Sequence, residues 1–282
     1  MSGQKSPVLV CVPGVMQGDW LYEPLKAEIA PLEVVALTLP GTVPLDDPRP
    51  ALDSMYPDVE LISKTISDLL DAGRDVIVLV HSYGGTPGGD AVGRIVAEQK
   101  QNTPAPGSGR ILWMIYSNAY PTIEGVSCWD SGDRLFEAAG IPKPASPGAM
   151  PGMEEKDGYL VPDSEAGPAF MHDVPDLETW VKKLGKQSVA CPLSPILAPA
   201  VGYRVVPTTY IKTLQDTVIP PDFQEGLVQQ AIQLSKEREG LVPFTDEEVG
   251  RLEIDSGHAP MLSKTTEYKD LIMKVVRRAM SA

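Results

Sequence analysis

Six short apolar runs recur along the chain, separated by longer stretches that are amphipathic or loop-like. Most of these runs are apolar at successive positions, which is typical of strands in a sheet that helices cover on both faces. They span residues 8–12, 34–37, 76–80, 111–116, 208–211 and 251–254, and the last two are weaker. Helical segments between the runs indicate parallel βαβ units. The pattern therefore predicts an α/β fold with a mostly parallel central sheet flanked by helices.

Helical periodicity is clearest in two places. Residues 58–71 place apolar side chains three and four positions apart, with Gly73 just past the end. Residues 268–276 repeat the pattern near the C-terminus, with lysines and arginines on the opposite face. We interpret that basic face as a solvated helix surface rather than a binding patch.

The span 120–207 breaks this rhythm, because it is rich in proline and glycine and shows no clear strand. We predict that it is an inserted cap, with residues 1–119 and 208–282 forming the α/β core. Residues 40–57, also rich in proline, are predicted to form a long surface loop. Three large side chains of the cap are candidates for the wall of a substrate pocket: Trp129, Met153 and Phe170.

Composition and net charge limit the classes of molecule that the protein is expected to bind. The 282 residues are 43% hydrophobic and 22% charged, as in an ordinary globular protein, and the net charge is −14. That charge disfavours nucleic acid and anionic membrane surfaces. No apolar run reaches the roughly 18 residues of a membrane span, and the first residues do not resemble a secretory leader. Three widely spaced cysteines predict neither a disulfide framework nor a metal site, so we expect a cytoplasmic protein with reduced thiols.

Ser82 is the candidate nucleophile. It lies in His81-Ser82-Tyr83-Gly84, between the run 76–80 and a predicted helix at 91–100. A sharp strand-to-helix turn holds such a residue in a strained backbone and needs small neighbours, which the glycines after it supply. This chain departs from the usual Gly-x-Ser-x-Gly pattern, because Val80 stands at the position of the first glycine. Taken alone, the segment is also compatible with an ordinary turn.

A serine hydroxyl needs a base, and the chain has three histidines. His81 would point away from the serine along its strand, and His172 lies in the predicted cap, where a surface or core role is favoured. His258, in a loop after the run 251–254, is the best candidate base.

An acid must orient this base. Asp216 follows the run 208–211 and should lie at the same sheet edge as Ser82, although a turn-forming role remains an alternative. Glu124 is the fallback acid.

Acyl transfer also requires donors for the developing oxyanion. The backbone N–H of Tyr83, directly after the nucleophile, is one candidate. The backbone N–H of Val15 is the other, because Gly14 lets the loop after the first strand turn inwards. A plain βα turn is an equal alternative for that loop, and Gly14 is also a candidate substrate contact.

These segments together resemble the α/β-hydrolase superfamily, in the branch of plant methyl esterases and hydroxynitrile lyases with their fungal and bacterial relatives. The matching segments are 13–20, 81–85, 215–224 and 257–258, and the chain order Ser82, Asp216, His258 is that of the superfamily. The resemblance implies nucleophile, acid and base roles for these three residues. Lyases of this branch carry threonine at the position of Gly14 and lysine at that of Ala259, so cyanohydrin cleavage is not expected.

The predicted function is that of a serine esterase, which cleaves a carboxylic ester or lactone of a small, mostly apolar molecule through an acyl-enzyme. Two alternatives remain open. The same site could serve a natural-product pathway as a lactone-forming cyclase or a C–C bond-cleaving lyase on a polyketide-like substrate, or the protein could be a ligand-binding receptor. The chemistry needs no cofactor or metal. Cap helices often pair in such folds, which leaves a homodimer open.

Overall fold

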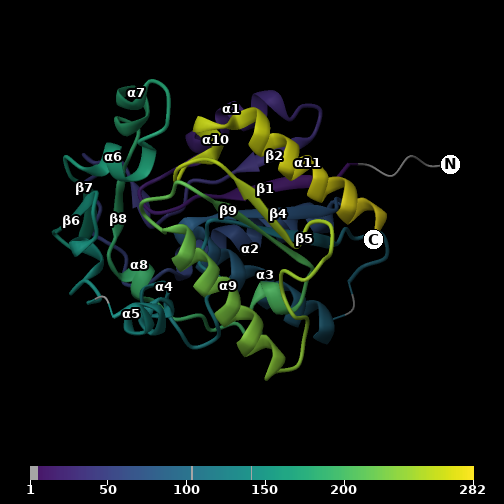
Figure 1. Cartoon of the computed structure of the whole chain (residues 1–282). Coiled ribbons are helices and arrows are strands. Elements are labelled where there is room, and N and C mark those ends of the chain that lie inside the picture. Colours follow the sequence, from purple (N-terminus) through teal and green to yellow (C-terminus); the bar gives the residue numbers. More distant parts are fainter. Residues whose placement is uncertain (1–5, 103, 141) are drawn as a thin grey trace.

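A six-stranded sheet forms the centre of the computed structural model, which describes residues 6–102, 104–140 and 142–282 (Figure 1). Its strands lie in the order β10-β9-β5-β4-β1-β2, and every neighbouring pair is parallel. They are β1 (Val8–Val12), β2 (Glu33–Ala36), β4 (Val76–His81), β5 (Ile111–Ser117), β9 (Thr208–Thr213) and β10 (Arg251–Ile254). The six predicted runs and the α/β fold class are therefore confirmed. The polar start of the chain, residues 1–5, lies outside the described residues.

Helices cover both faces of the sheet, which explains why the strands are apolar at successive positions. In β1, Val8, Val10 and Val12 belong to one buried cluster, whereas Leu9 and Cys11 belong to another. The first cluster includes side chains of α2 (Tyr56–Asp71), α3 (Gly85–Gln101) and α9 (Pro221–Lys236). The second includes side chains of α1 (Glu23–Glu28), α10 (Pro260–Ser263) and α11 (Thr265–Ser281). The helix after Ser82 begins at Gly85, six residues before the predicted start.

The segment between β5 and β9 folds over one end of the sheet (Figure 1, left). It contains α4 (Cys128–Ser131), α5 (Asp133–Ala139), β6 (Met153–Lys156), β7 (Tyr159–Pro162), α6 (Ala166–Met171), α7 (Leu177–Val181), β8 (Lys186–Ser188) and α8 (Ala190–Leu193). The expectation that it has no clear strand was wrong, because β6, β7 and β8 form a four-stranded sheet together with β3 (Thr42–Val43), in the order β3-β8-β7-β6. Its assignment as an inserted cap, residues 120–207, between two strands of the core sheet stays a prediction.

The predicted surface loop at 40–57 is also partly structured. It contributes β3 (Thr42–Val43), which pairs antiparallel with β8 and is buried. The chain next to β3 is tied down too, because the backbone N–H of Gly41 donates to the buried Asp58 carboxylate at 2.6 Å. This loop therefore links the segment 120–207 to the rest of the structure.

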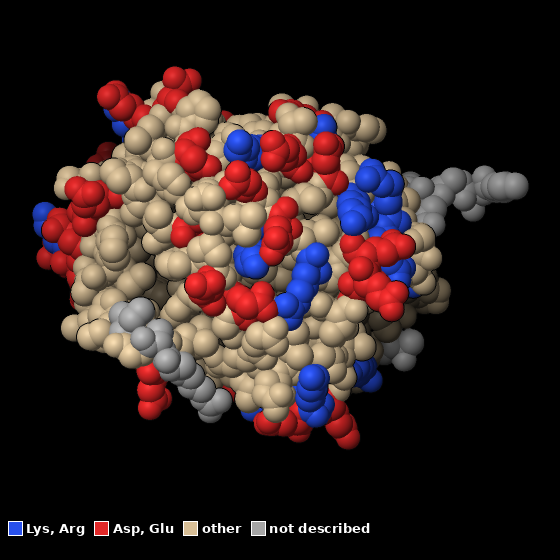
Figure 2. Space-filling view, in the orientation of Figure 1, with Lys and Arg blue, Asp and Glu red and all other residues tan. Residues whose placement is uncertain are grey.

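Charged side chains are spread over the surface. Figure 2 shows acidic and basic groups interleaved on the face that carries α9 and α11. On α11, Arg278 pairs with Asp246 at 2.9 Å and Lys274 donates to the backbone oxygen of Glu248 at 2.8 Å. These contacts support the interpretation of the C-terminal basic residues as a solvated helix face.

Candidate active site

Ser82 lies at the carboxyl end of β4, at the start of a short turn that leads into α3. Its φ angle of 52° places it in the left-handed region, which is strained for a residue with a side chain. The turn is tight, because a Cβ on Gly84 would lie 2.5 Å from the backbone oxygen of Pro13. Val80 is accommodated by Gly88 of α3, where a Cβ would lie 2.5 Å from Val80 Cγ1. The turn therefore forms even though the first glycine of the usual pattern is absent.

Asp216 and His258 form a buried pair. His258 Nδ1 lies 2.9 Å from Asp216 Oδ2, and both side chains are almost completely buried. Burial alone would raise the pKa of Asp216, but His258 and several hydrogen bonds lower it to about 2. The backbone N–H groups of Val218 and Ile219 each donate to Oδ1 at 2.9 Å. Asp216 is thus held as a carboxylate that faces the imidazole.

Two residues that the sequence reasoning missed complete this arrangement. Thr213 Oγ1 and Asn118 Nδ2 each donate to Asp216 Oδ2 at 2.9 Å. The Asn118 amide also donates to the backbone oxygen of His258 at 2.9 Å. Asn118 follows β5 directly, and Asp216 lies three residues after the end of β9, so a polar residue soon after an apolar strand was the signal that could have identified Asn118.

His81 connects the nucleophile strand to the loop of the base. Its Nε2 lies 2.8 Å from the backbone oxygen of His258, and its Nδ1 lies 3.1 Å from Gln17 Oε1. Complete burial lowers the pKa of His81 to about 3, so the ring is neutral at neutral pH. The loop that carries His258 is therefore fixed beside the residue that precedes Ser82.

The loop after β1 approaches the serine closely. A Cβ on Gly14 would lie 2.8 Å from Ser82 Cβ and 3.2 Å from Ser82 Oγ. The N–H of Gly14 donates to Gln17 Oε1 at 3.2 Å, whereas Val15 and Tyr83 both line the space in front of Ser82. Two backbone segments thus converge on the nucleophile candidate, as an oxyanion hole would require, and the donor roles of Val15 and Tyr83 stay predictions.

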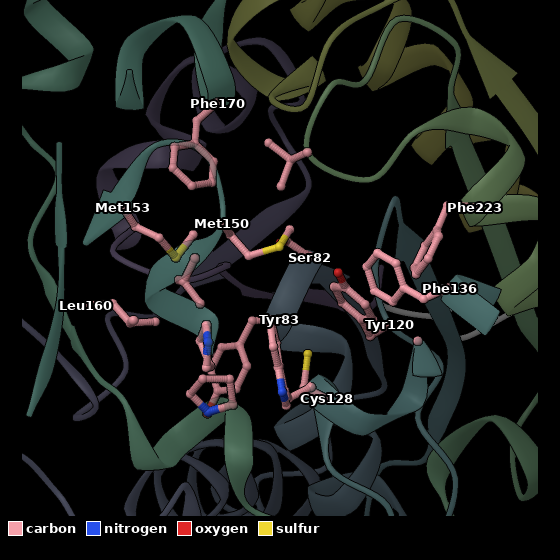
Figure 3. Close-up of a pocket in the computed structure, with 16 residues that line it drawn as sticks. Ser82, Tyr83, Tyr120, Cys128, Phe136, Met150, Met153, Leu160, Phe170 and Phe223 are labelled. Carbon is pink, nitrogen blue, oxygen red and sulfur yellow. The ribbon is translucent and has the colours of Figure 1, made fainter. Parts of the chain in front are cut away.

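An apolar pocket opens over Ser82 (Figure 3). The predicted wall residues Trp129, Met153 and Phe170 all line it. The ring centroid of Phe170 lies 5.8 Å from that of His258, which places this wall against the base. The remaining lining residues are Val15, Ser82, Tyr83, Tyr120, Cys128, Gly132, Phe136, Pro147, Met150, Leu160, Pro192, Val218 and Phe223.

The structure separates the other candidates from this centre. Glu124 Oε1 pairs with Arg204 at 2.6 Å and accepts from the backbone N–H of Val201 at 2.9 Å. The fallback acid therefore has a structural role. His172 is exposed at the end of α6, close to Gly257.

Within the described ranges, no group of three or more His, Cys, Asp or Glu side chains is arranged to hold a metal ion. No helix of these ranges is long and apolar enough to cross a membrane.

Comparison with known proteins decides the family. The model of the "Alpha/beta hydrolase family" matches residues 9–271. The chain belongs to the alpha/beta hydrolase family. This confirms the superfamily that the motifs resemble, and it makes the protein a hydrolase by family.

Relatives of this alpha/beta hydrolase include two fungal proteins. "Probable hydrolase R7" of a Phoma species is 30% identical over 278 residues, which cover 95% of this chain and 98% of the relative. "Alpha/beta hydrolase nvfD" of Aspergillus novofumigatus is 24% identical and covers 97% of this chain and 96% of its own.

Solved structures share the fold at lower identity. A pyrethroid hydrolase from Sphingobium faniae matches with a TM-score of 0.66 at 19% identity, over 99% of this chain and all of its own. Polyneuridine aldehyde esterase matches with a TM-score of 0.66 at 18% identity, over 96% of this chain and 99% of its own.

Proposed function

We propose that this alpha/beta hydrolase is a serine esterase that cleaves a carboxylic ester or lactone of a small, mostly apolar molecule through an acyl-enzyme. The observation that carries the proposal is the position of Ser82 in a left-handed turn that faces an apolar pocket. The buried Asp216–His258 pair follows two strands of the same parallel sheet. The names of the two structural neighbours, a hydrolase and an esterase, support this class of reaction.

The mechanism follows from the hydrogen bonds of the pair. Asp216 accepts a hydrogen bond from the Nδ1–H of His258, which leaves Nε2 as the base that takes the proton of Ser82. Ser82 Oγ attacks the ester carbonyl, and the backbone N–H groups of Val15 and Tyr83 stabilise the resulting oxyanion. His258 then protonates the leaving alcohol. Water, deprotonated by the same imidazole, releases the acid from Ser82.

Cys128 is the competing nucleophile in the pocket. Burial raises the pKa of its thiol to about 12, so the thiolate that would attack a carbonyl is scarce at neutral pH. Ser82 has both the strained turn and the neighbouring Asp216–His258 pair, which favours it over the cysteine.

A fluorophosphonate probe tests the nucleophile directly. We expect the intact protein to gain the mass of one probe, and Ser82→Ala and His258→Ala to gain none. Ser63→Ala, on α2 and outside the pocket, serves as the control and should label like the wild type. A folded wild-type protein that stays unlabelled, or a Ser82→Ala variant that still labels, would contradict the proposal.

Lactone formation is the second candidate, and the apolar lining of the pocket favours it. If water is excluded, a hydroxyl of the substrate itself can capture the acyl-enzyme. An ester that carries a δ-hydroxyl group on its acyl chain separates the two reactions. Hydrolysis in H₂¹⁸O gives a labelled acid, whereas cyclisation gives an unlabelled lactone.

A further inference from the structure

We infer that the Tyr120 hydroxyl binds substrate and selects esters with a second oxygen, a carbonyl or hydroxyl, β to the scissile carbonyl. This inference rests on the proposed role of Ser82 as the nucleophile. It assigns Tyr120 to recognition of the acyl group rather than to stabilisation of the oxyanion.

The backbone holds Tyr120 next to Ser82. The N–H of Tyr120 donates to the backbone oxygen of Ser82 at 3.2 Å. A Cβ on Gly85 would lie 2.6 Å from the backbone oxygen of Tyr120, so the two segments are in close contact. Figure 3 shows the Tyr120 side chain among the groups that surround Ser82, close to Phe136. The tyrosine is thus built into the same turn as the nucleophile.

The order of the strands places Tyr120 on a particular side of the serine. In the sheet, β4 lies between β1 and β5. The loop with Val15 follows β1, and Tyr120 follows β5. The oxyanion donor and the tyrosine therefore flank Ser82 from opposite sides. A substrate whose carbonyl oxygen points to Val15 presents a neighbouring part of its acyl chain to Tyr120.

The hydroxyl of Tyr120 has the properties of a ligand-binding donor. Within residues 6–102, 104–140 and 142–282, no hydrogen bond of this hydroxyl is found, although the side chain lines the pocket. The second tyrosine of the pocket differs, because the Tyr83 hydroxyl donates to Asp58 at 2.9 Å. The Tyr120 side chain is half-buried and lines the pocket, so its hydroxyl is free to bind a ligand oxygen there.

Tyr120 also keeps its proton. Burial raises the pKa of its hydroxyl above the usual range, and the negative charge of Asp216 raises it further. The group is therefore a neutral donor, and it selects an acceptor oxygen rather than a cation. The rest of the wall is mainly aromatic and aliphatic, so the body of the substrate should be apolar.

Two phenyl esters of equal chain length, phenyl hexanoate and phenyl 3-hydroxyhexanoate, test the inference. We expect the wild-type protein to prefer the hydroxylated ester in kcat/KM, and Tyr120→Phe to reduce that preference about tenfold. The readout is the ratio of the two kcat/KM values, because a general loss of activity lowers both values equally and leaves the ratio unchanged. Tyr116→Phe is the matched control, because it removes a buried hydroxyl without a partner from β5, outside the pocket. An equal loss on both esters, or no loss, would overturn the inference.

A binding measurement separates this inference from the proposed function. We would titrate Ser82→Ala, with and without Tyr120→Phe, with nonan-2-one and 4-hydroxynonan-2-one, which are not esters. A preference for the hydroxyketone that disappears with Tyr120→Phe supports the inference even if the wild-type protein hydrolyses no ester. Ester turnover combined with equal binding of the two ketones in both variants would leave the esterase intact and refute the role of Tyr120.

Discussion

Asn118 donates a hydrogen bond of 2.9 Å to Oδ2 of Asp216, the oxygen that also accepts from His258. The same amide donates to the backbone oxygen of His258 at 2.9 Å. Asn118 has a φ angle of 34°, in the left-handed region that asparagine tolerates better than most residues. A single residue after β5 therefore positions both the acid and the loop of the base.

Asn118→Asp would place a second carboxylate beside Asp216. Because two neighbouring carboxylates disfavour each other's ionised form, the pKa of Asp216 should rise. We expect the acid limb of the kcat/KM profile to move to higher pH and the rate at pH 7 to fall by about tenfold or more. Asn118→Gly is the control, because it tolerates the left-handed backbone and loses the hydrogen bonds without adding charge. A pH profile of Asn118→Asp that coincides with that of Asn118→Gly would refute the charge effect.

Asp216 should make the stability of the protein sensitive to acid. Its pKa is about 2 in the folded chain, against an ordinary aspartate value of 3.8. A carboxyl with a lowered pKa stabilises the fold above its unfolded pKa, and that contribution is lost as the pH falls through the folded value. A pKa lowered this far corresponds to roughly 2 to 3 kcal/mol in the free energy of unfolding.

Urea unfolding of the wild type and of Asp216→Asn at pH 7, 4 and 2.5 measures this contribution. The wild type should lose more stability than the variant between pH 4 and 2.5, whereas parallel losses would exclude the effect. Asp216→Asn should also lower kcat by about 10⁴-fold, because the base loses the group that fixes its tautomer.

The central sheet was predictable because its strands are buried on both faces, so successive apolar residues mark them. β6 and β8 were not, because they are three or four residues long and largely polar, with the sequences MEEK and KQS. β8 pairs with β3, which comes from a distant part of the chain, and no local pattern encodes that pairing. β6 pairs with β7 across the two-residue turn Asp157-Gly158, so the local signal for this hairpin was present in the sequence and was missed.

The residues of the site also fall into a group that the sequence made recognisable and a group that it did not. Ser82, Asp216 and His258 were recognisable because each lies in a short motif at the end of a strand. Asn118 and Tyr120 lie in an equally suitable place, after β5, but their roles depend on contacts with segments far away in the sequence. Residue type and local spacing do not specify those contacts.

Asp58 is a buried carboxylate behind the pocket wall. It accepts hydrogen bonds from the backbone N–H of Gly41 at 2.6 Å and from the Tyr83 hydroxyl at 2.9 Å. Burial nevertheless raises the pKa of Asp58 to about 6. The neighbouring Tyr83 and Cys191 also have pKa values raised by burial, so both are neutral at neutral pH. The ionised Asp58 therefore has no cationic partner in this cluster.

The raised pKa of Asp58 predicts that the free energy of unfolding falls at high pH. A carboxyl whose pKa is higher in the folded chain destabilises the fold increasingly as the pH rises from its unfolded pKa to its folded one. Between pH 5 and pH 8 the wild type should lose about 1 kcal/mol that Asp58→Asn does not lose. Asp53→Asn, at an exposed position, is the control and should follow the wild type. If Asp58→Asn also follows the wild type, Asp58 is already ionised at pH 5.

Gly14 leaves no room for a side chain beside the nucleophile. A Cβ there would lie 2.8 Å from Ser82 Cβ and 2.9 Å from Gln17 Oε1, so the loop or the serine would have to move. Because displacement of a reacting group by about 1 Å can cost about 100-fold in rate, Gly14→Ala should lower kcat/KM and the rate of fluorophosphonate labelling by about that factor. Gly14→Thr, which introduces the residue of the hydroxynitrile lyases, should be worse. Gly167→Ala, whose Cβ would lie 3.2 Å from a flexible Val181 methyl group in α7, controls for the added methyl group. Full labelling of Gly14→Thr would mean that the loop after β1 is not held against Ser82, and Val15 would then lose its role as an oxyanion donor.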